Sequence, residues 1–102
     1  MGIMEMSDAQ INLAIAKIEY PDKEVGSLDN GSAFVVYHPT SGVKNYIKYW
    51  GDIGPILDRE EINLNKHDWG LWVAFTDDHE YYDLSPTKAV AVCFLKIKGV
   101  DI

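Results

Sequence analysis

Cysteine is almost absent from this sequence, which contains a single one, Cys93, among its 102 residues. A lone cysteine excludes an internal disulfide and a zinc site built from cysteines, and it fits a reducing compartment. Cys93 lies in an apolar run of helical character. A buried structural thiol is therefore a better interpretation of Cys93 than a nucleophile.

Positive charge is also scarce. Nine Lys and Arg residues stand against sixteen Asp and Glu residues, the formal net charge is −7, and Arg59 is the only arginine. Nucleic-acid binding needs clustered cations to neutralise phosphates, and a negative protein is repelled by anionic lipids. We therefore expect no direct nucleic-acid partner and no membrane partner. The negative charge favours a basic protein as the partner.

Long apolar runs are missing as well. No stretch of eighteen apolar residues occurs, so the sequence predicts no transmembrane helix. Residues Met1–Met6 lack both the basic region and the apolar stretch of a secretory signal. These absences predict a soluble cytoplasmic protein. Residues 1–6 are expected to form a flexible N-terminus, followed by a single domain over residues 7–102.

Catalytic motifs are equally lacking. There is no Gly-x-Ser-x-Gly sequence, and the loop Gly26–Gly31 lacks the lysine and following helix of a phosphate-binding loop. The histidines His38, His67 and His79 contain no pair at helical i, i+4 spacing. His67 and Asp68 could act as an acid–base pair in a cleft, but a hairpin turn is the simpler interpretation. The sequence therefore predicts no cofactor, no metal and no enzymatic activity.

Two helices are predicted in the first sixty residues. A capping box completed by Gln10, followed by an apolar stripe, predicts a helix over Ser7–Ile18. A second, short helix is predicted over Trp50–Arg59, with Asp52 as its cap and Pro55 in its first turn.

A third helix is predicted near the C-terminus. Ser85 is a capping residue and Pro86 suits the first helical position. The segment Ala89–Leu95 is apolar on every face, so this helix should be buried at the centre of the core.

The strands are expected between these helices. Ala33–His38 and Val43–Tyr49 read as extended segments, and Ile62–Phe75 reads as a hairpin. Pro21–Ser32 and the acidic Thr76–Leu84 read as loops. The predicted fold is a small α+β domain. Its mostly antiparallel sheet of three or four strands is packed by the N-terminal helix, the short middle helix and the buried C-terminal helix.

Three segments resemble the NinX family of small accessory proteins of lambdoid-type phages. They are the opening helix around residues 6–16, the run 50–57 with the strand 62–64, and the closing helix 85–95. The most recognisable feature is the Trp-x-Asp-x-Gly-Pro signature, which falls here on Trp50, Asp52, Gly54 and Pro55. The resemblance implies a phage or prophage origin and a role in the bacterial host cytoplasm, but it implies no activity. Without the family, the same residues can serve as a packed corner.

The most unusual segment is acidic and spans residues 77–83. One hypothesis is a metal-dependent hydrolase with His79, Asp77 and Asp78 as ligands, and the alternative is an ordinary solvated loop. A further hypothesis is DNA mimicry, in which carboxylates in paired rows on one surface replace phosphates. The charges for mimicry would be Asp58, Glu60, Glu61, Asp77, Asp78, Glu80 and Asp83.

Aromatic residues beside this segment suggest a protein-binding surface. If Leu71, Val73 and Phe75 face the core, then Trp72 points away from it and is exposed. If a second layer covers that face, Trp72 is part of the core instead. The leading hypothesis is a non-enzymatic protein that binds a host or phage protein. An exposed apolar face could equally be the interface of a homo-oligomer. Its candidate surface comprises Trp72, Asp77, Asp78, His79, Glu80, Tyr81 and Tyr82.

Overall fold

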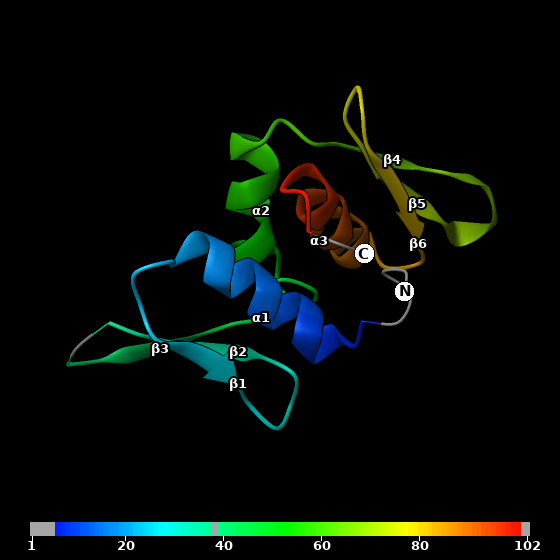
Figure 1. Cartoon of the computed structure of the whole chain (residues 1–102). Helices are drawn as coiled ribbons and strands as arrows, with labels where there is room; N and C mark the ends of the chain where they lie inside the picture. Colours follow the sequence, from blue (N-terminus) through cyan, green and yellow to red (C-terminus); the bar gives the residue numbers. More distant parts are fainter. Residues whose placement is uncertain (1–5, 38, 101–102) are drawn as a thin grey trace.

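The computed structural model describes residues 6–37 and 39–100, so the N-terminal residues 1–5, His38 and residues 101–102 lie outside the described residues. Helices lie between two β-sheets in a layered arrangement (Figure 1). The elements follow the order α1 (Asp8–Glu19), β1 (Val25–Ser27), β2 (Ala33–Val36), β3 (Ser41–Lys44), α2 (Trp50–Arg59), β4 (Asn63–Lys66), β5 (Trp72–Phe75), β6 (Glu80–Asp83) and α3 (Pro86–Ile97). A 3-10 turn over Asp68–Gly70 connects β4 to β5.

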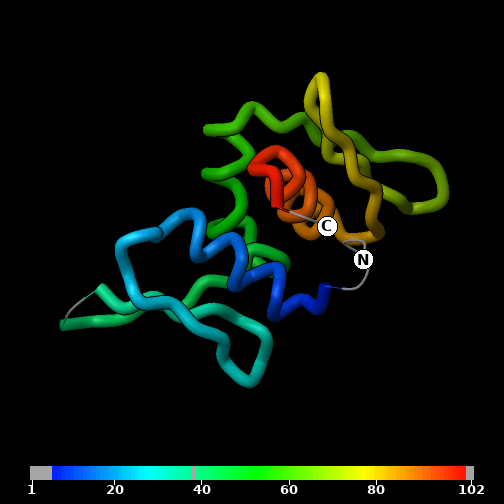
Figure 2. The backbone as a smooth tube through the Cα atoms, viewed as in Figure 1, coloured from blue at the N-terminus to red at the C-terminus, as the bar shows by residue number. Residues whose placement is uncertain are grey.

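The α+β class is confirmed, but the strands form two sheets where one is expected. Sheet A is β1–β2–β3 and sheet B is β4–β5–β6, and all neighbouring strands are antiparallel. Helix α1 packs on sheet A and α3 packs on sheet B (Figure 2). Every strand pairs with a neighbour in sequence, and α2 lies between the two sets of three. Short connections close at low entropic cost, which favours two local sheets over one long-range sheet.

The edge strands differ most from expectation. Strand β1 falls in the predicted loop Pro21–Ser32, and β6 falls in the predicted acidic loop Thr76–Leu84. Strand β3 ends at Lys44, after which the chain turns instead of staying extended to Tyr49. These strands have only three or four residues and are held by pairing with β2 or β5. Local preferences are weak guides to such strands because pairing and burial decide them.

Helix α3 forms the centre of the core, as predicted. Every residue of Ala89–Leu95 is fully buried. The helix starts as expected, since Ser85 Oγ accepts the amide of Lys88 at 3.3 Å and Pro86 occupies the first position. The buried cluster around α3 continues into α1, α2 and both sheets through Ile11, Ile15, Ala33, Val35, Ile53, Ile56 and Ala74.

Helix α1 begins with the predicted capping box. The amide of Gln10 donates to Ser7 Oγ at 3.1 Å, and the amide of Ser7 donates to Gln10 Oε1 at 2.7 Å. These two bonds satisfy two of the amides that a helix start leaves without partners.

Helix α2 has the predicted bounds, but Asp52 does not cap it as predicted. The residue before it, Tyr49, makes no side-chain cap, and the Asp52 carboxylate accepts the amide of Asn45 at 2.8 Å instead of capping the helix. Because the helix already begins at Trp50, Pro55 lies in its second turn and not in its first. Proline cannot donate to a carbonyl one turn earlier, and the carbonyl concerned belongs to the exposed Gly51, where water can replace the bond.

A buried polar network ties α1 to the chain around sheet A. Asn12 Nδ2 donates to the Gly31 carbonyl at 2.8 Å and to Asn45 Oδ1 at 3.1 Å, and Asn12 Oδ1 accepts the amide of Tyr46 at 2.8 Å. Asn45 Nδ2 then donates to Ser32 Oγ at 3.2 Å. In the described ranges no buried side-chain nitrogen or oxygen lacks a partner. One asparagine therefore fixes two connections that are far apart in the sequence.

The C-terminal ends of the three helices meet in an ion-pair network. Arg59 binds both carboxylate oxygens of Glu19 at 2.8 Å and reaches Glu60 at 3.0 Å, while Lys98 lies 3.4 Å from Glu60. Both cations also lie over the Phe94 ring, 5.8 and 5.6 Å from its centroid. Burial alone would raise the pKa of Glu60, but the hydrogen bond from Arg59 and the Lys98 charge outweigh it and lower the pKa.

Helices α2 and α3 end in the same way with different residues. Glu61 follows α2 with φ of 55°, and Gly99 follows α3 with φ of 73°. In each case the next amide reaches back 3.0 Å to a carbonyl of the last turn, from Ile62 to Leu57 and from Val100 to Leu95. This termination favours glycine because other residues are strained at positive φ.

Replacing Glu61 with glycine should therefore raise the free energy of unfolding by about 0.5–1 kcal/mol, since relief of the left-handed strain exceeds the added freedom of the unfolded chain. Gly99→Ala is the matched opposite change and should lower it by about 1 kcal/mol. Urea denaturation of both variants measures the effect. A destabilised Glu61→Gly protein would contradict this account of the α2 terminus.

Candidate protein-binding surface

Sheet B presents opposite faces to the core and to solvent. Ala74 is fully buried, and its partners across the sheet, Leu64 and Tyr81, both pack against the core. Because alternate residues share a face, Trp72 lies on this inner side with Ala74. Of the two orientations that the sequence leaves open, the structure therefore has the one with Trp72 on the core side, and not the one with Leu71, Val73 and Phe75 toward the core. Both alternating sets are apolar, so the pattern did not determine which one faces α3.

The outer face of sheet B carries a small apolar surface. Val73 lies between Asn65 and Tyr82, and Phe75 lies between Asn63 and Glu80. Val73 is only 8% exposed, yet it does not belong to the main core cluster, so its neighbours on the outer face cover it. The exposed Tyr82 meets the ring of His67 edge-on, with the two centroids 5.4 Å apart. We call Leu71, Val73, Phe75 and Tyr82 the outer patch.

Trp69 lies at the tip of the β4–β5 hairpin and is 92% exposed. Its φ is 68°, and Gly70 beside it also has positive φ. The amide of His67 donates to the Leu71 carbonyl at 2.7 Å and closes the turn around Trp69. A large aromatic residue that is both strained and exposed stabilises the folded chain poorly, and such positions cluster at functional sites. The candidate surface predicted from the sequence omits Trp69, although an aromatic residue inside a turn is a readable signal.

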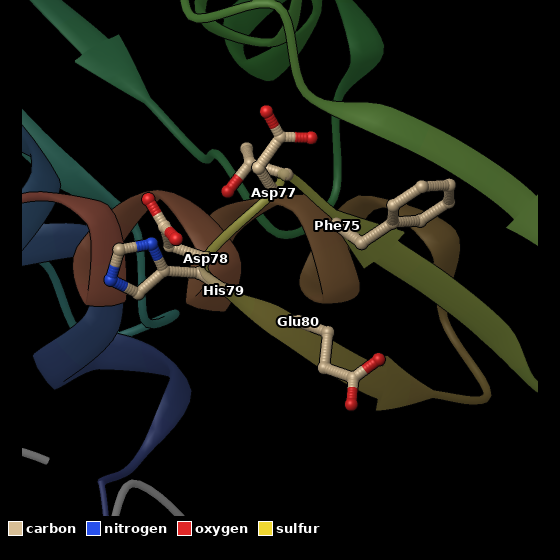
Figure 3. A pocket seen from close by; sticks show the side chains of 6 residues that line it. Phe75, Asp77, Asp78, His79 and Glu80 are labelled. Atoms are coloured by element: carbon tan, nitrogen blue, oxygen red, sulfur yellow. The ribbon is translucent and has the colours of Figure 1, made fainter.

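The acidic segment forms a tight turn followed by β6. The amide of Thr76 donates to the His79 carbonyl at 2.8 Å and closes the turn around Asp77 and Asp78. The turn borders an open hollow of about 270 Å³, lined by residues 75–80. In Figure 3 the carboxylates of Asp77 and Glu80 point away from each other. Among the residues that the structure describes, no three His, Cys, Asp or Glu side chains are grouped to hold a metal ion.

The residues proposed from the sequence as one surface are divided by the sheet. Trp72 and Tyr81 are half-buried on the inner side, where Lys96 Nζ lies 5.5 Å from the Tyr81 ring and burial raises the pKa of the Tyr81 hydroxyl. Glu80 and Tyr82 alternate with them and are exposed. The turn residues Asp77 and Asp78 are exposed, and His79 is half-buried.

The carboxylates of sheet B lack ion-pair partners. Elsewhere, Asp8 pairs with Lys88, Asp52 with Lys44, and both Glu19 and Glu60 with Arg59. Residues 63–83 contain five carboxylates and one lysine, Lys66. Within the described chain none of these five lies within 4 Å of a cationic nitrogen: Asp68, Asp77, Asp78, Glu80 and Asp83. Lys66 lies opposite Trp72 in the register of β4 and β5, on the inner face of the sheet.

The charges needed for DNA mimicry do not form paired rows. Glu60 is held by Arg59 and Lys98. Glu80 and Asp83 point to opposite faces of β6, and the Asp83 carboxylate accepts the amide of Ser85 at 2.9 Å. The arrangement therefore gives mimicry no support.

The family-like signature belongs mainly to the framework. Asp52 joins α2 to the turn after β3, and Gly54 is half-buried between the buried Ile53 and Ile56. Trp50 is 46% exposed and Pro55 is also exposed, so neither forms the packed corner that the sequence suggested. The isoleucines of α2 make that contact with α3 instead.

Cys93 should not react with thiol reagents while the protein is folded. Its side chain is fully buried, and burial raises the pKa of the thiol to about 11, so little thiolate exists at neutral pH. We expect labelling by iodoacetamide at least a hundredfold slower in native protein than in 8 M urea. The mass of the intact protein after timed exposure measures it. Rapid labelling of the native form would mean that α3 opens to solvent.

No helix within residues 6–37 and 39–100 is long and apolar enough to cross a membrane. In comparisons with known proteins, neither a protein-family model nor a curated sequence matches this chain.

Proposed function

We propose that this chain is a phage-encoded accessory protein that acts by binding another protein through the outer patch and the adjacent Trp69. Exposure of Trp69 is the single observation that carries the proposal. Tryptophan and tyrosine dominate the energetics of protein interfaces. Trp69, in the turn between β4 and β5, and Tyr82, in β6, are both exposed.

The arrangement of the reactive side chains supports binding over catalysis. His67 stands near one end of sheet B and His79 at the other, since Lys66 pairs with Trp72 while Phe75 pairs with Glu80. Cys93, a residue of α3, is fully buried in the core. Of these three groups, His79 alone lines the hollow beside the acidic turn, so they do not converge there as a nucleophile and its base must.

The resemblance of residues 50–57 to the phage family supports the remainder of the proposal, which is a role in the cytoplasm of a bacterial host. In that setting a small protein can act by occupying a surface of a host or phage protein. The affinity would come from aromatic anchors in a desolvated centre.

Site-specific photo-cross-linking in infected host cells tests the proposal. Trp69→p-benzoylphenylalanine should yield one discrete adduct, whereas the same replacement of Trp50, an exposed tryptophan outside sheet B, should not. Mass spectrometry identifies the partner. A second change, Tyr82→Ser, should reduce the adduct at position 69 at least fivefold, since it removes part of the same interface. Equal cross-linking from positions 69 and 50, or none from 69, would refute the proposal.

A further inference from the structure

Sheets A and B share a topology but differ in charge. Residues 25–44 contain one carboxylate and one lysine, whereas residues 63–83 contain five carboxylates and one lysine. Both sheets are three-stranded antiparallel meanders, each packed on one helix. The acidity of sheet B is therefore not a requirement of this architecture, which sheet A satisfies without it.

The acidic side chains border the outer patch at both ends. Asp68 precedes Trp69 at one end, and Asp77, Asp78 and Glu80 stand at the other, next to Phe75. The apolar strip from Leu71 to Phe75 is about 13 Å long, at about 3.3 Å per residue. An apolar centre with a charged rim is the usual anatomy of a protein interface.

The sign of this rim selects the partner. A second copy of the chain would bring one acidic rim against another, and like charges across an interface are strongly unfavourable. Nucleic acid is excluded by the same sign. A basic protein fits, because its cations would meet carboxylates that have no cationic nitrogen within 4 Å in the described chain.

We infer that the outer patch binds a basic protein, which places apolar side chains against Leu71, Phe75 and Tyr82 around the covered Val73 and sets Lys or Arg side chains against the carboxylates at either end. This inference rests on the proposed function and specifies its partner. Contacts with the patch and Trp69 set the lifetime of the complex, and the acidic rim sets the rate of association and its dependence on salt.

Three synthetic peptides test the inference by titration into ¹⁵N-labelled protein. The first has a five-residue apolar centre with two lysines at each end, the second replaces the lysines with glutamates, and the third keeps the lysines around a serine centre. At 20 mM salt, the first should shift the amide signals of residues 71–75 and 82 and bind at least tenfold more tightly than either of the others. Raising the salt to 300 mM should weaken its binding at least fivefold.

Two charge variants provide the matched comparison. Asp77→Asn, Asp78→Asn and Glu80→Gln together should remove most of the preference for lysine over glutamate. Asp22→Asn, Glu24→Gln and Asp29→Asn remove the same charge beside sheet A and should leave that preference intact. If both variants lose it equally, net charge is responsible and the inference fails.

The other outcomes separate the inference from the proposed function. Equal binding of the lysine and glutamate peptides at the patch would overturn the inference and leave protein binding standing. Patch signals that move with protein concentration alone would identify a second copy as the occupant. No shift at the patch with any peptide would refute the basic-partner assignment, while cross-linking at position 69 decides the proposed function independently.

Discussion

Replacing Asn12 with alanine should lower the free energy of unfolding by about 2–4 kcal/mol, because each buried polar group left without a partner costs about 1–3 kcal/mol. The change removes three hydrogen bonds, to Gly31, Asn45 and Tyr46, at a residue that is 1% exposed. The Tyr46 amide loses the acceptor that its bond at 2.8 Å provides. In a domain of this size the melting temperature should fall by about 10–25 °C.

Urea denaturation followed by circular dichroism measures the loss. Lys17→Ala is the matched control, since Lys17 lies on the exposed side of the same helix, and it should change stability by less than about 0.5 kcal/mol. If Asn12→Ala is as stable as this control, the hydrogen bonds of Asn12 do not hold the connections of sheet A to α1.

Replacing Phe94 with alanine should cost more, about 3–5 kcal/mol, because it opens a cavity at the centre of the core. Among the residues that the structure describes, Phe94 is the largest fully buried side chain, and its ring also lies beneath Arg59 and Lys98. Small domains are stable by only about 5–15 kcal/mol, so this single change can remove most of the stability.

A graded series keeps the Phe94 prediction measurable. Phe94→Leu retains most of the buried volume and should cost about 1–2 kcal/mol, less than the alanine value. Native-state hydrogen exchange of the α3 amides measures the loss of stability in both variants. Similar exchange rates in the wild type and the two variants would show that α3 is not the element on which the others depend.

The helices could be predicted from the sequence because their signals are local. Ser7 bonds with Gln10 and Ser85 with Lys88 within one turn, and Pro86 suits the first helical position, so nearby residues suffice to predict these helix starts. The burial of Ala89–Leu95 was also readable, since a helix apolar on all sides has no solvent-facing side. Asp52 was assigned the wrong role because its partner, Asn45, belongs to the preceding turn and not to the helix.

The division into two sheets could not be predicted in the same way. Pairing of β1 with β2, or β5 with β6, depends on hydrogen bonds between strands of three or four residues, which leave little trace in composition. Tyr81 and Tyr82 favour a strand, but the acidic residues around them favour a loop, and the strand prevails because Tyr81 packs against the core.

The candidate surface depended on one orientation that the sequence left open. Leu71, Val73 and Phe75 are as apolar as the set that includes Trp72 and Ala74, and α3 packs on the second set. The small side chain of Ala74 allows α3 to approach the sheet closely, which favours the orientation with Ala74 and Trp72 toward the helix. The place of Trp69 in a turn was readable from the sequence, but its positive φ and its exposure are properties of the folded turn.

The position of α3 in the chain has a consequence for synthesis on the ribosome. Each sheet is completed within about twenty consecutive residues, 25–44 and 63–83, so its hairpins can form as they emerge. The helix that both halves of the core require, residues 86–97, emerges after them. Until then the apolar residues of both sheets lack the helix at the centre of their core, so stable packing of the two halves waits for α3.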